Sequence, residues 1–315
     1  MASGYRRLLE RWLGRWIAPI ATADVRTLLM TGVAAGFGGV FGTPVAGAVF
    51  ALEVPAIGRM SYAAALPCLL GAIVADRTCA MWGIHHTVYP QLVEFGLNGQ
   101  GLGGVLDWML LAKVAAAGVV FGLASRLFSG AVHGMMSVFA VVVKAPVLRP
   151  VVGGLLVIAM VYALGTRDYL GIGVTSPEPG AVSIVSAFRA DGAHTWSWFW
   201  KLLCTAVTLG AAFKGGEVTP LFFVGATLGN TLGGPMGAPT PLMAGLEFVA
   251  VFAGATNTPL ACTIMALELF GPGCVLYFAV ACFMAYLCSG HAGVYRSERV
   301  GSGKFAGGTQ RWNAR

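Results

Sequence analysis

The segment from Phe213 to Pro220, with the sequence FKGGEVTP, combines residue types that could bind a small anion. Two glycines precede a proline of the kind found in the first turn of a helix, so a helix is expected to begin here. Glycines let the backbone approach an ion closely, and the free N–H groups of a helix start can donate to it. Gly216 and the hydroxyl of Thr219 are therefore candidate anion ligands.

Glu217 adds a carboxyl group to the same segment, within an apolar stretch of the chain. Ionisable groups in such surroundings are energetically costly and often functional. Burial would favour the protonated form, so this side chain could take up a proton. The structural alternative is that Glu217 only pairs with Lys214, which lies three residues earlier.

Two distant stretches repeat one unusual phrase: residues 37–54 read FGGVFGTPVAGAVFALEV and residues 252–269 read FAGATNTPLACTIMALEL. Each copy has a Thr-Pro that opens a helix, then an apolar run and a closing glutamate, Glu53 or Glu268. Such a repeat in an apolar chain is typical of a transporter built from two related halves. The glutamates could cap neighbouring helices or relay protons, and the sequence leaves both roles open.

The composition predicts a membrane protein that positions these residues in lipid. The chain is 57% hydrophobic and only 10% charged, with a mean hydropathy of +0.76, whereas about a quarter of a soluble domain is charged. The net charge of +7 fits Lys- and Arg-rich cytoplasmic loops rather than a nucleic-acid partner. Among the 45 glycines, the runs Gly32–Gly42 and Gly225–Gly237 are predicted to form the tightest helix crossings.

The apolar segments differ in length, and several are shorter than the ~20 residues that cross a bilayer. Helices are therefore expected to end inside the membrane, where backbone ends are tolerated only in a cavity or within protein. Loops are predicted at 85–101 and 167–180. The predicted segments are 26–42, 44–54, 61–80, 103–133, 150–165, 178–189, 196–213, 219–233, 240–255, 259–270 and 272–289.

Metal and enzyme chemistry find no support in the sequence. The seven cysteines form no C-x-x-C pair and the five histidines show no metal spacing, so no metal or other cofactor is predicted. No H-E-x-x-H or G-x-S-x-G motif occurs, so an enzyme is not expected.

The paired phrases GTPVAGAVFALE and NTPLACTIMALE, with GGEVTPLFFVGATLG between them, resemble the CLC family of chloride channels and anion/proton antiporters. The resemblance covers about residues 25–300. It implies an all-α polytopic membrane fold of two inverted halves with short and broken helices. It also implies a homodimer whose subunits each hold an anion path. The interface would come from helices matching roughly 44–54, 61–80, 259–270 and 272–289.

Within that family the chain is similar to the fluoride/proton antiporter branch, because chloride members usually have Ile-Phe-Ala where this chain has Glu-Val-Thr at 217–219. The match implies that Thr219 and the backbone near Val218 bind the anion, while Glu217 couples protons. Tyr295, which composition alone would make an interfacial anchor, would be the inner-gate tyrosine. Fluoride is small and strongly hydrated, so strong donors are needed to replace its water.

Two features depart from the family pattern. Chloride/proton exchangers typically place a second glutamate where this chain has Val54, and the gating glutamate of the G-[RK]-E-G motif has no counterpart. The chain thus resembles an N-terminally truncated member whose 315 residues alone do not perform coupled antiport. Family register predicts the following parts: 1–20, the amphipathic end of the gating helix; 21–142, the rest of the first half; 143–300, the second half; 301–315, a disordered cytoplasmic tail.

The sequence therefore predicts a multi-pass anion transporter of the cell membrane, most simply the bacterial inner membrane. Its partners would be fluoride or chloride ions, protons, the lipid bilayer and a second copy of the chain. Fluoride/proton antiport for fluoride export is the first hypothesis, impaired in the truncated form. A passive chloride or fluoride channel and a non-transporting dimerising subunit are the alternatives.

Overall fold

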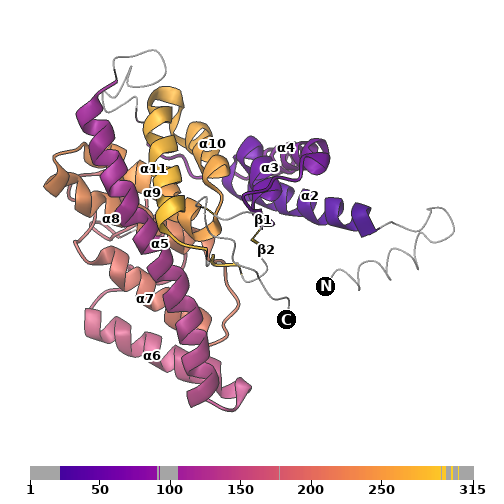
Figure 1. Cartoon of the computed structure of the whole chain (residues 1–315). Coiled ribbons are helices and arrows are strands. Elements are labelled where there is room, and N and C mark those ends of the chain that lie inside the picture. Colours follow the sequence, from indigo (N-terminus) through magenta and orange to yellow (C-terminus); the bar gives the residue numbers. More distant parts are fainter. Residues whose placement is uncertain are drawn as a thin grey trace. The chain divides into compact units, whose positions relative to one another are not determined.

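The computed structural model is mostly helical (Figure 1), and it describes residues 22–90, 92, 106–176, 178–291, 293–295, 299–300 and 304. Its contacts divide the chain into two compact units, Met1–Glu53 with Met60–His86, and Val54–Arg59 with Thr87–Arg315. The predicted segment 1–20 lies outside the described residues, as does the tail 301–315 apart from Lys304. The inverted halves 21–142 and 143–300 stay a prediction.

The first unit consists of α2 (Thr22–Phe41), α3 (Pro44–Glu53) and α4 (Ala65–Met81), with the 3-10 turn η1 (Tyr62–Ala64) leading into α4. Small residues let these helices touch. A Cβ atom added at Gly47 of α3 would lie 2.9 Å from the carbonyl oxygen of Ala34, and one at Gly38 of α2 would lie 3.1 Å from Ala72. A Cβ atom added at Gly32 or at Gly36 would have no neighbouring atom within 4 Å. The predicted close crossing is therefore confirmed only for the later part of the run Gly32–Gly42.

The second unit is organised around α5 (Trp108–Val142), whose 35 residues span about 52 Å at about 1.5 Å per residue. α5 packs against α7, α9 and α11 (Figure 1). The short strands β1 (Ala56–Ile57) and β2 (Arg299–Val300) pair in parallel, with Ala56 opposite Arg299. The other elements of this unit are η3 (Pro146–Leu148), α6 (Arg149–Leu164), η4 (Ser186–Phe188), α7 (Ser197–Gly210), α8 (Val218–Met236), α9 (Thr240–Thr256), α10 (Pro259–Phe270), η5 (Pro272–Cys274) and α11 (Val275–Cys288).

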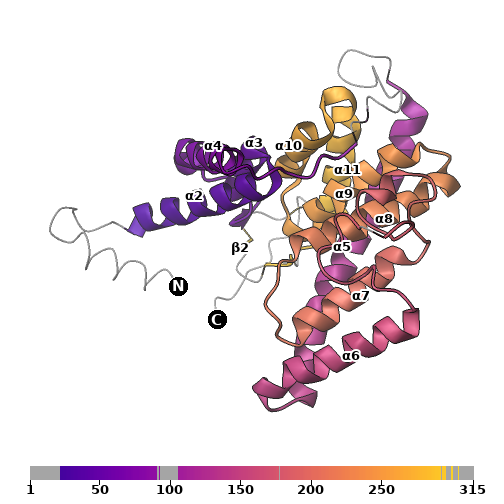
Figure 2. The ribbon, with the colours of Figure 1, turned by 180° about the vertical axis from the view of Figure 1, so that it is seen from behind.

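A stripe of glycines on α8 brings this helix into backbone contact with α9, and Figure 2 shows the two helices in the same layer. A Cβ atom at Gly225 would lie 2.4 Å from the carbonyl oxygen of Glu247, and one at Gly229 would lie 2.4 Å from that of Met243. At Gly233, one turn further, an added Cβ atom would lie 3.1 Å from the Cα atom of Thr240 in α9. The prediction of a tight crossing in this run is confirmed, since only residues without a side chain fit there.

Both copies of the sequence repeat break one helix and start another in the same way. Gly42 and Asn257 occupy equivalent positions, and both have left-handed backbones with φ of 67° and 56°. Asparagine is one of the few residues other than glycine that tolerates this conformation. The next helices, α3 and α10, each begin at the proline of the Thr-Pro pair. The predicted helix starts at these two prolines are therefore confirmed.

One predicted apolar helix, 178–189, is wrong. The chain there forms turns, and only Ser186–Phe188 is a 3-10 turn. Gly180 adopts a left-handed φ of 83°, and the N–H groups of Ser183 and Ser186 each donate to the other residue's hydroxyl, at 2.8 and 3.1 Å. Such local side-chain bonds offer the backbone an alternative to the helix.

The helix lengths agree with a polytopic membrane protein whose helices partly end within the bilayer. Among the described residues, three helical stretches are long and apolar enough to span a membrane: Tyr62–Met81, Trp108–Val142 and Pro146–Leu164. Others, including Thr240–Thr256 and Pro259–Phe270, are apolar but shorter than a full span. The prediction of apolar segments of uneven length is thus confirmed, while the ending of some helices inside the bilayer stays a prediction.

The glycine stripe makes a testable prediction about stability. Gly229→Ala should lower the free energy of unfolding by about 1–3 kcal/mol, because the new methyl group meets the carbonyl of Met243. Gly234→Ala, on the same helix, is the matched control, since no atom lies within 4 Å of its added Cβ. Thermal unfolding of the purified variants in detergent compares the two. Equal losses at both positions would contradict this account of the α8–α9 contact.

Candidate functional site

The predicted helix start in the FKGGEVTP segment is present. α8 begins at Val218, and Glu217 precedes it as the N-cap residue without a capping bond from its side chain. The N–H of Leu221 already donates to the carbonyl of Glu217, at 3.2 Å. The N–H groups before it have no partner within a helix, and they carry the positive end of its dipole. The start of α8 is therefore able to bind an anion.

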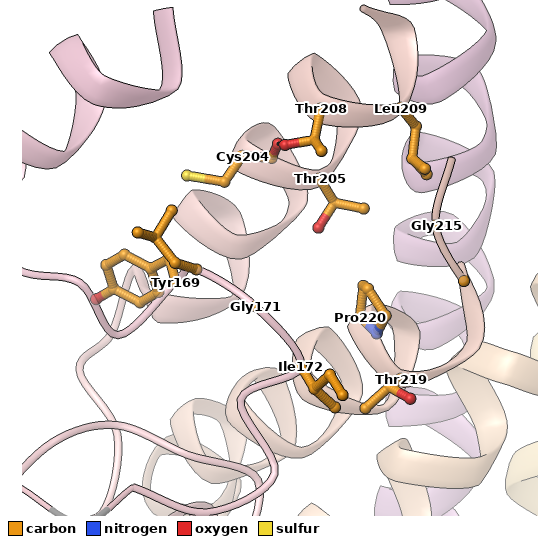
Figure 3. A pocket seen from close by; sticks show the side chains of 12 residues that line it. Tyr169, Gly171, Ile172, Cys204, Thr205, Thr208, Leu209, Gly215, Thr219 and Pro220 are labelled. Atoms are coloured by element: carbon orange, nitrogen blue, oxygen red, sulfur yellow. Dashed lines mark hydrogen bonds between the residues drawn. The ribbon is translucent and has the colours of Figure 1, made fainter. Parts of the chain in front are cut away.

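A cavity of about 350 Å³ lies beside this helix start, in the second unit. The segment Tyr169–Ile172 forms one part of its wall. The remaining residues come from α7 and from the approach to α8. They are Cys204, Thr205, Thr208, Leu209, Gly215, Gly216, Thr219 and Pro220. Figure 3 shows the α7 residues on one side and Ile172, Thr219 and Pro220 on the other.

Three threonines line the cavity, but their hydroxyl groups differ. Thr205 donates to the carbonyl of Lys201 at 2.8 Å, and Thr208 donates to that of Cys204 at 2.7 Å. These two hydrogens are used within α7. No corresponding bond from the Thr219 hydroxyl is found in the part of the chain that the structure describes. The hydroxyl of Thr219 is thus not used by a bond of the kind that Thr205 and Thr208 make, and its role as an anion ligand stays a prediction.

Glu217 is half-buried, whereas Lys214 is exposed. In the described part of the chain no ion pair within 4 Å joins them, so the structural alternative of a Lys214–Glu217 pair is not supported. Glu217 and Val218 adjoin Thr219 in the chain but are not among the residues that line the cavity. The predicted proton-coupling role of Glu217 and the anion contact of the Val218 backbone stay predictions.

Tyr295 is half-buried and follows Val294, whose N–H donates to the carbonyl of Ala255 at 2.8 Å. This bond places the tyrosine after the last helix and near the end of α9. Tyr295 does not line the cavity beside Thr219. Its meeting with the anion site stays a prediction.

The two glutamates of the repeat lie at equivalent places in their helices. Glu53 is the last residue of α3, and Glu268 is two residues from the end of α10. Both side chains are half-buried. The position agrees with either a capping or a relay role, and both roles stay predictions.

Two buried ionisable residues were not predicted from the sequence. Lys201 of α7 is 1% exposed and sits behind the cavity wall. Glu247 of α9 is completely buried, and neither of its oxygens has a hydrogen-bond partner among the described residues. Each is the single charged residue of its apolar helix, which is a signal that the sequence offers. An ionised Glu247 would be costly in such a place.

Metal ligands do not gather within the described residues, where no group of three or more His, Cys, Asp or Glu side chains could hold an ion. None of the seven cysteines, all of which lie among the described residues, forms a disulfide.

The family model described as voltage gated chloride channel matches residues 5–290 of this sequence. The chain belongs to this family. Its all-α fold agrees with that membership. Against a crystal structure of a CLC-type fluoride/proton antiporter, the fold has a TM-score of 0.80 at 30% sequence identity. That match covers 95% of this chain and 71% of the antiporter.

Two further proteins are similar to this chain in sequence or in fold. A chloride/fluoride channel protein of Pseudomonas syringae pv. tomato is 47% identical over 287 residues, which is 89% of this chain. The chain spans 60% of the length of that protein. The structure of a slow cyanobacterial Cl⁻/H⁺ antiporter has a TM-score of 0.62 at 17% identity, over 92% of this chain and 66% of the antiporter, and it shows the fold alone.

The available hydroxyl of Thr219 makes a prediction about binding. Thr219→Val should weaken fluoride binding by about ten- to 150-fold, because a hydrogen bond to a charged group is worth about 1.5–3 kcal/mol. Thr208 lines the same cavity, but its hydroxyl already donates to the carbonyl of Cys204. The fluoride affinity of Thr208→Val should therefore stay near that of the unmodified protein. Isothermal titration of the purified proteins measures both. Equal affinities in the two variants would exclude Thr219 as a ligand.

Proposed function

We propose that this member of the voltage-gated chloride channel family carries the anion path of a fluoride/proton antiporter that exports fluoride. The observation that carries the proposal is the start of α8. Gly216 and Thr219 face a cavity of about 350 Å³ there, and Glu217 stands between them in the chain. The likeness to a structure titled as a CLC-type fluoride/proton antiporter, at 30% identity, supports the choice of ion.

The chemistry of the site suits fluoride. Its strongly held water has to be replaced by strong donors. The first N–H groups of α8 and the Thr219 hydroxyl are such donors, and the helix dipole adds to their effect. We place the anion against the backbone of Gly216 and Val218 and against Thr219. Tyr295 would close this path on the inner side.

Glu217 supplies the link to protons. An ionised carboxylate next to a bound anion repels it, whereas a protonated one does not. Fluoride and a proton therefore bind more tightly together than either does alone, which is a positive coupling between two ligands. The side chain is half-buried and has no ion pair with Lys214, so it can exchange its proton with the site.

A second candidate is a passive anion channel. The 315 residues hold no G-[RK]-E-G segment, so the carboxylate that gates family members has no counterpart among them. Without that group an anion could pass with no proton moving. For these 315 residues by themselves we accordingly expect impaired coupling, with the anion-binding part of the site retained.

A third candidate is a non-transporting subunit that only dimerises. We propose that the chain forms a homodimer in the bacterial inner membrane, as the family resemblance implies. α4 exposes Leu66 and Leu70, and α11 separately exposes Phe283, so each helix by itself has apolar side chains suited to contact with lipid or another subunit. Under this third candidate function, the protein forms a dimer and does not transport ions.

The proton link of Glu217 is tested by anion binding. Fluoride affinity should rise at least threefold when the pH is lowered from 7.5 to 5.5, because a larger fraction of Glu217 is then protonated and no longer repels the anion. Glu217→Gln should bind tightly at both pH values. Glu178→Gln changes an exposed carboxyl group and should keep the pH dependence of the unmodified protein. Titration calorimetry gives the affinities, and a Glu217→Gln variant that still responds to pH would contradict the role.

Ion flux shows whether the 315-residue chain transports anions and whether that transport is coupled to protons. The 315-residue protein is reconstituted in proteoliposomes, and fluoride and protons are followed together with an electrode and a pH dye. We expect fluoride movement with little accompanying proton movement. Tightly coupled exchange would show that these residues suffice for antiport and would overturn the expected impairment. A dimer by light scattering with no flux of either ion would favour the non-transporting subunit.

A further inference from the structure

Lys201 is a buried cation next to the candidate anion site. It lies in α7, and its side chain is 1% exposed. Charged groups are rarely buried to this extent, because losing water is costly unless partners replace it. The partners of this ammonium group therefore indicate what the residue does.

Backbone carbonyls, rather than an acidic side chain, surround the ammonium group. Nζ donates to the carbonyl oxygen of Gly171 at 2.7 Å, of Tyr169 at 3.3 Å and of Leu170 at 3.5 Å. An ammonium group has three N–H donors, so three acceptors match its charged form. The ring of Phe223 lies below it, with Nζ 4.8 Å from the centroid, which adds a cation–π contact.

The charge of Lys201 is solvated but not neutralised. In the described part of the chain, no carboxylate oxygen lies within 4 Å of Nζ. The acidic residue nearest in sequence to the accepting carbonyls, Asp168, instead accepts from the N–H of Val182 at 3.1 Å. No carboxylate in the described residues thus offsets the positive charge of the protonated lysine, and charges in a protein interior act over longer distances than in water.

The backbone around the ammonium group is shaped to approach it. Gly171 and Gly173 both have left-handed backbones, with φ of 57° and 70°. A Cβ atom at Gly173 would lie 2.8 Å from the Phe223 ring and 3.3 Å from Nζ. These glycines let the chain turn closely around the cation, which a residue with a side chain would prevent.

The same segment is a wall of the cavity at the start of α8. Tyr169, Leu170 and Gly171, whose carbonyls hold the ammonium group, all line it. Cys204 and Thr205 follow Lys201 by three and four residues, on the same face of α7, and line it as well (Figure 3). Lys201 therefore lies directly behind the wall of the site.

We infer that Lys201 is the fixed positive charge of the anion site, an inference that rests on the anion-binding function proposed above. Its hydrogen bonds hold the Tyr169–Gly171 wall in place, and its unneutralised charge attracts the anion to the start of α8. The lysine and the helix dipole act on the anion with the same sign. Lys201 touches the wall rather than the ion, so it is a positioning residue.

Charge and hydrogen bonding are separated by two substitutions. Lys201→Gln keeps N–H donors for the carbonyls but removes the charge, and it should weaken fluoride and chloride binding about tenfold in titration calorimetry. Lys201→Arg keeps the charge and should bind within about threefold of the unmodified protein. Lys113→Gln is the matched control, because Lys113 also donates to a backbone carbonyl, that of Gly237 at 2.9 Å, and it should bind normally.

Modification of Cys204 reports on the wall independently of anion binding. Cys204 lines the cavity and is 4% exposed, so N-ethylmaleimide should label it slowly. Lys201→Met removes both charge and donors and should raise the labelling rate at least fivefold, measured by peptide mass spectrometry, whereas Lys113→Met should not. An unchanged rate in Lys201→Met would overturn the holding role.

The binding results also distinguish this inference from the proposed function. If the unmodified protein binds anions and Lys201→Gln binds them within twofold, the charge has no role and the inference alone is overturned. If Lys201→Arg is folded by its melting curve but binds as weakly as Lys201→Gln, the inference is likewise overturned. If the unmodified protein binds neither fluoride nor chloride, the proposed function fails together with it.

Discussion

The unpaired start of α8 is the constraint on which the rest of the site depends. A helix that begins inside a membrane protein has first-turn N–H groups for which no preceding turn supplies carbonyl acceptors. In lipid these N–H groups need another hydrogen-bond partner. α8 begins at Val218, after a Gly-Gly-Glu sequence and without a side-chain cap. The cavity beside it and the positive charge behind the cavity wall both favour an anion as that partner.

Close helix packing is what permits such an interior helix start. α8 packs directly against the backbone of α9 at Gly225, Gly229 and Gly233. This close packing holds the helix firmly although its first turn borders a cavity. α9 in turn is anchored to α5, where the buried hydroxyl of Ser125 lies 2.7 Å from the carbonyl of Val251. Dispersion and polar contacts of this kind replace the hydrophobic effect, which does not drive helices together in lipid.

Three ionisable residues of the second unit lie in apolar surroundings but differ in burial and in their hydrogen-bond partners. Glu217 is half-buried at a helix start. Lys201 is buried but solvated by backbone carbonyls. Glu247 is completely buried, and its oxygens have no partner within the described residues. The proposals for proton coupling and anion attraction rest on the first two. Glu217 adjoins lining residues in the chain, and the ammonium group of Lys201 donates to the carbonyls of residues that line the cavity.

The sequence by itself determined the membrane class, the family and the places where helices break. Those features depend on local chemistry: Thr-Pro opens α3 and α10, and Gly or Asn supplies the left-handed residue before each. Local patterns also misled, because 178–189 is apolar but its serines and Gly180 hold turns instead of a helix. Part of the candidate anion site was predicted in the same way, since Gly216 and Thr219 lie at the helix start in the sequence.

Only the tertiary structure decided which residues lie across the cavity from the start of α8. The Tyr169–Ile172 segment and the α7 face around Thr205 join Thr219 at one cavity, although they are separated from it in sequence by about 14 to 50 residues. The role of Lys201 has the same origin, because its acceptors lie some 30 residues earlier in the chain. Such contacts arise from how helices and loops pack, and no periodicity or spacing within a single segment encodes them.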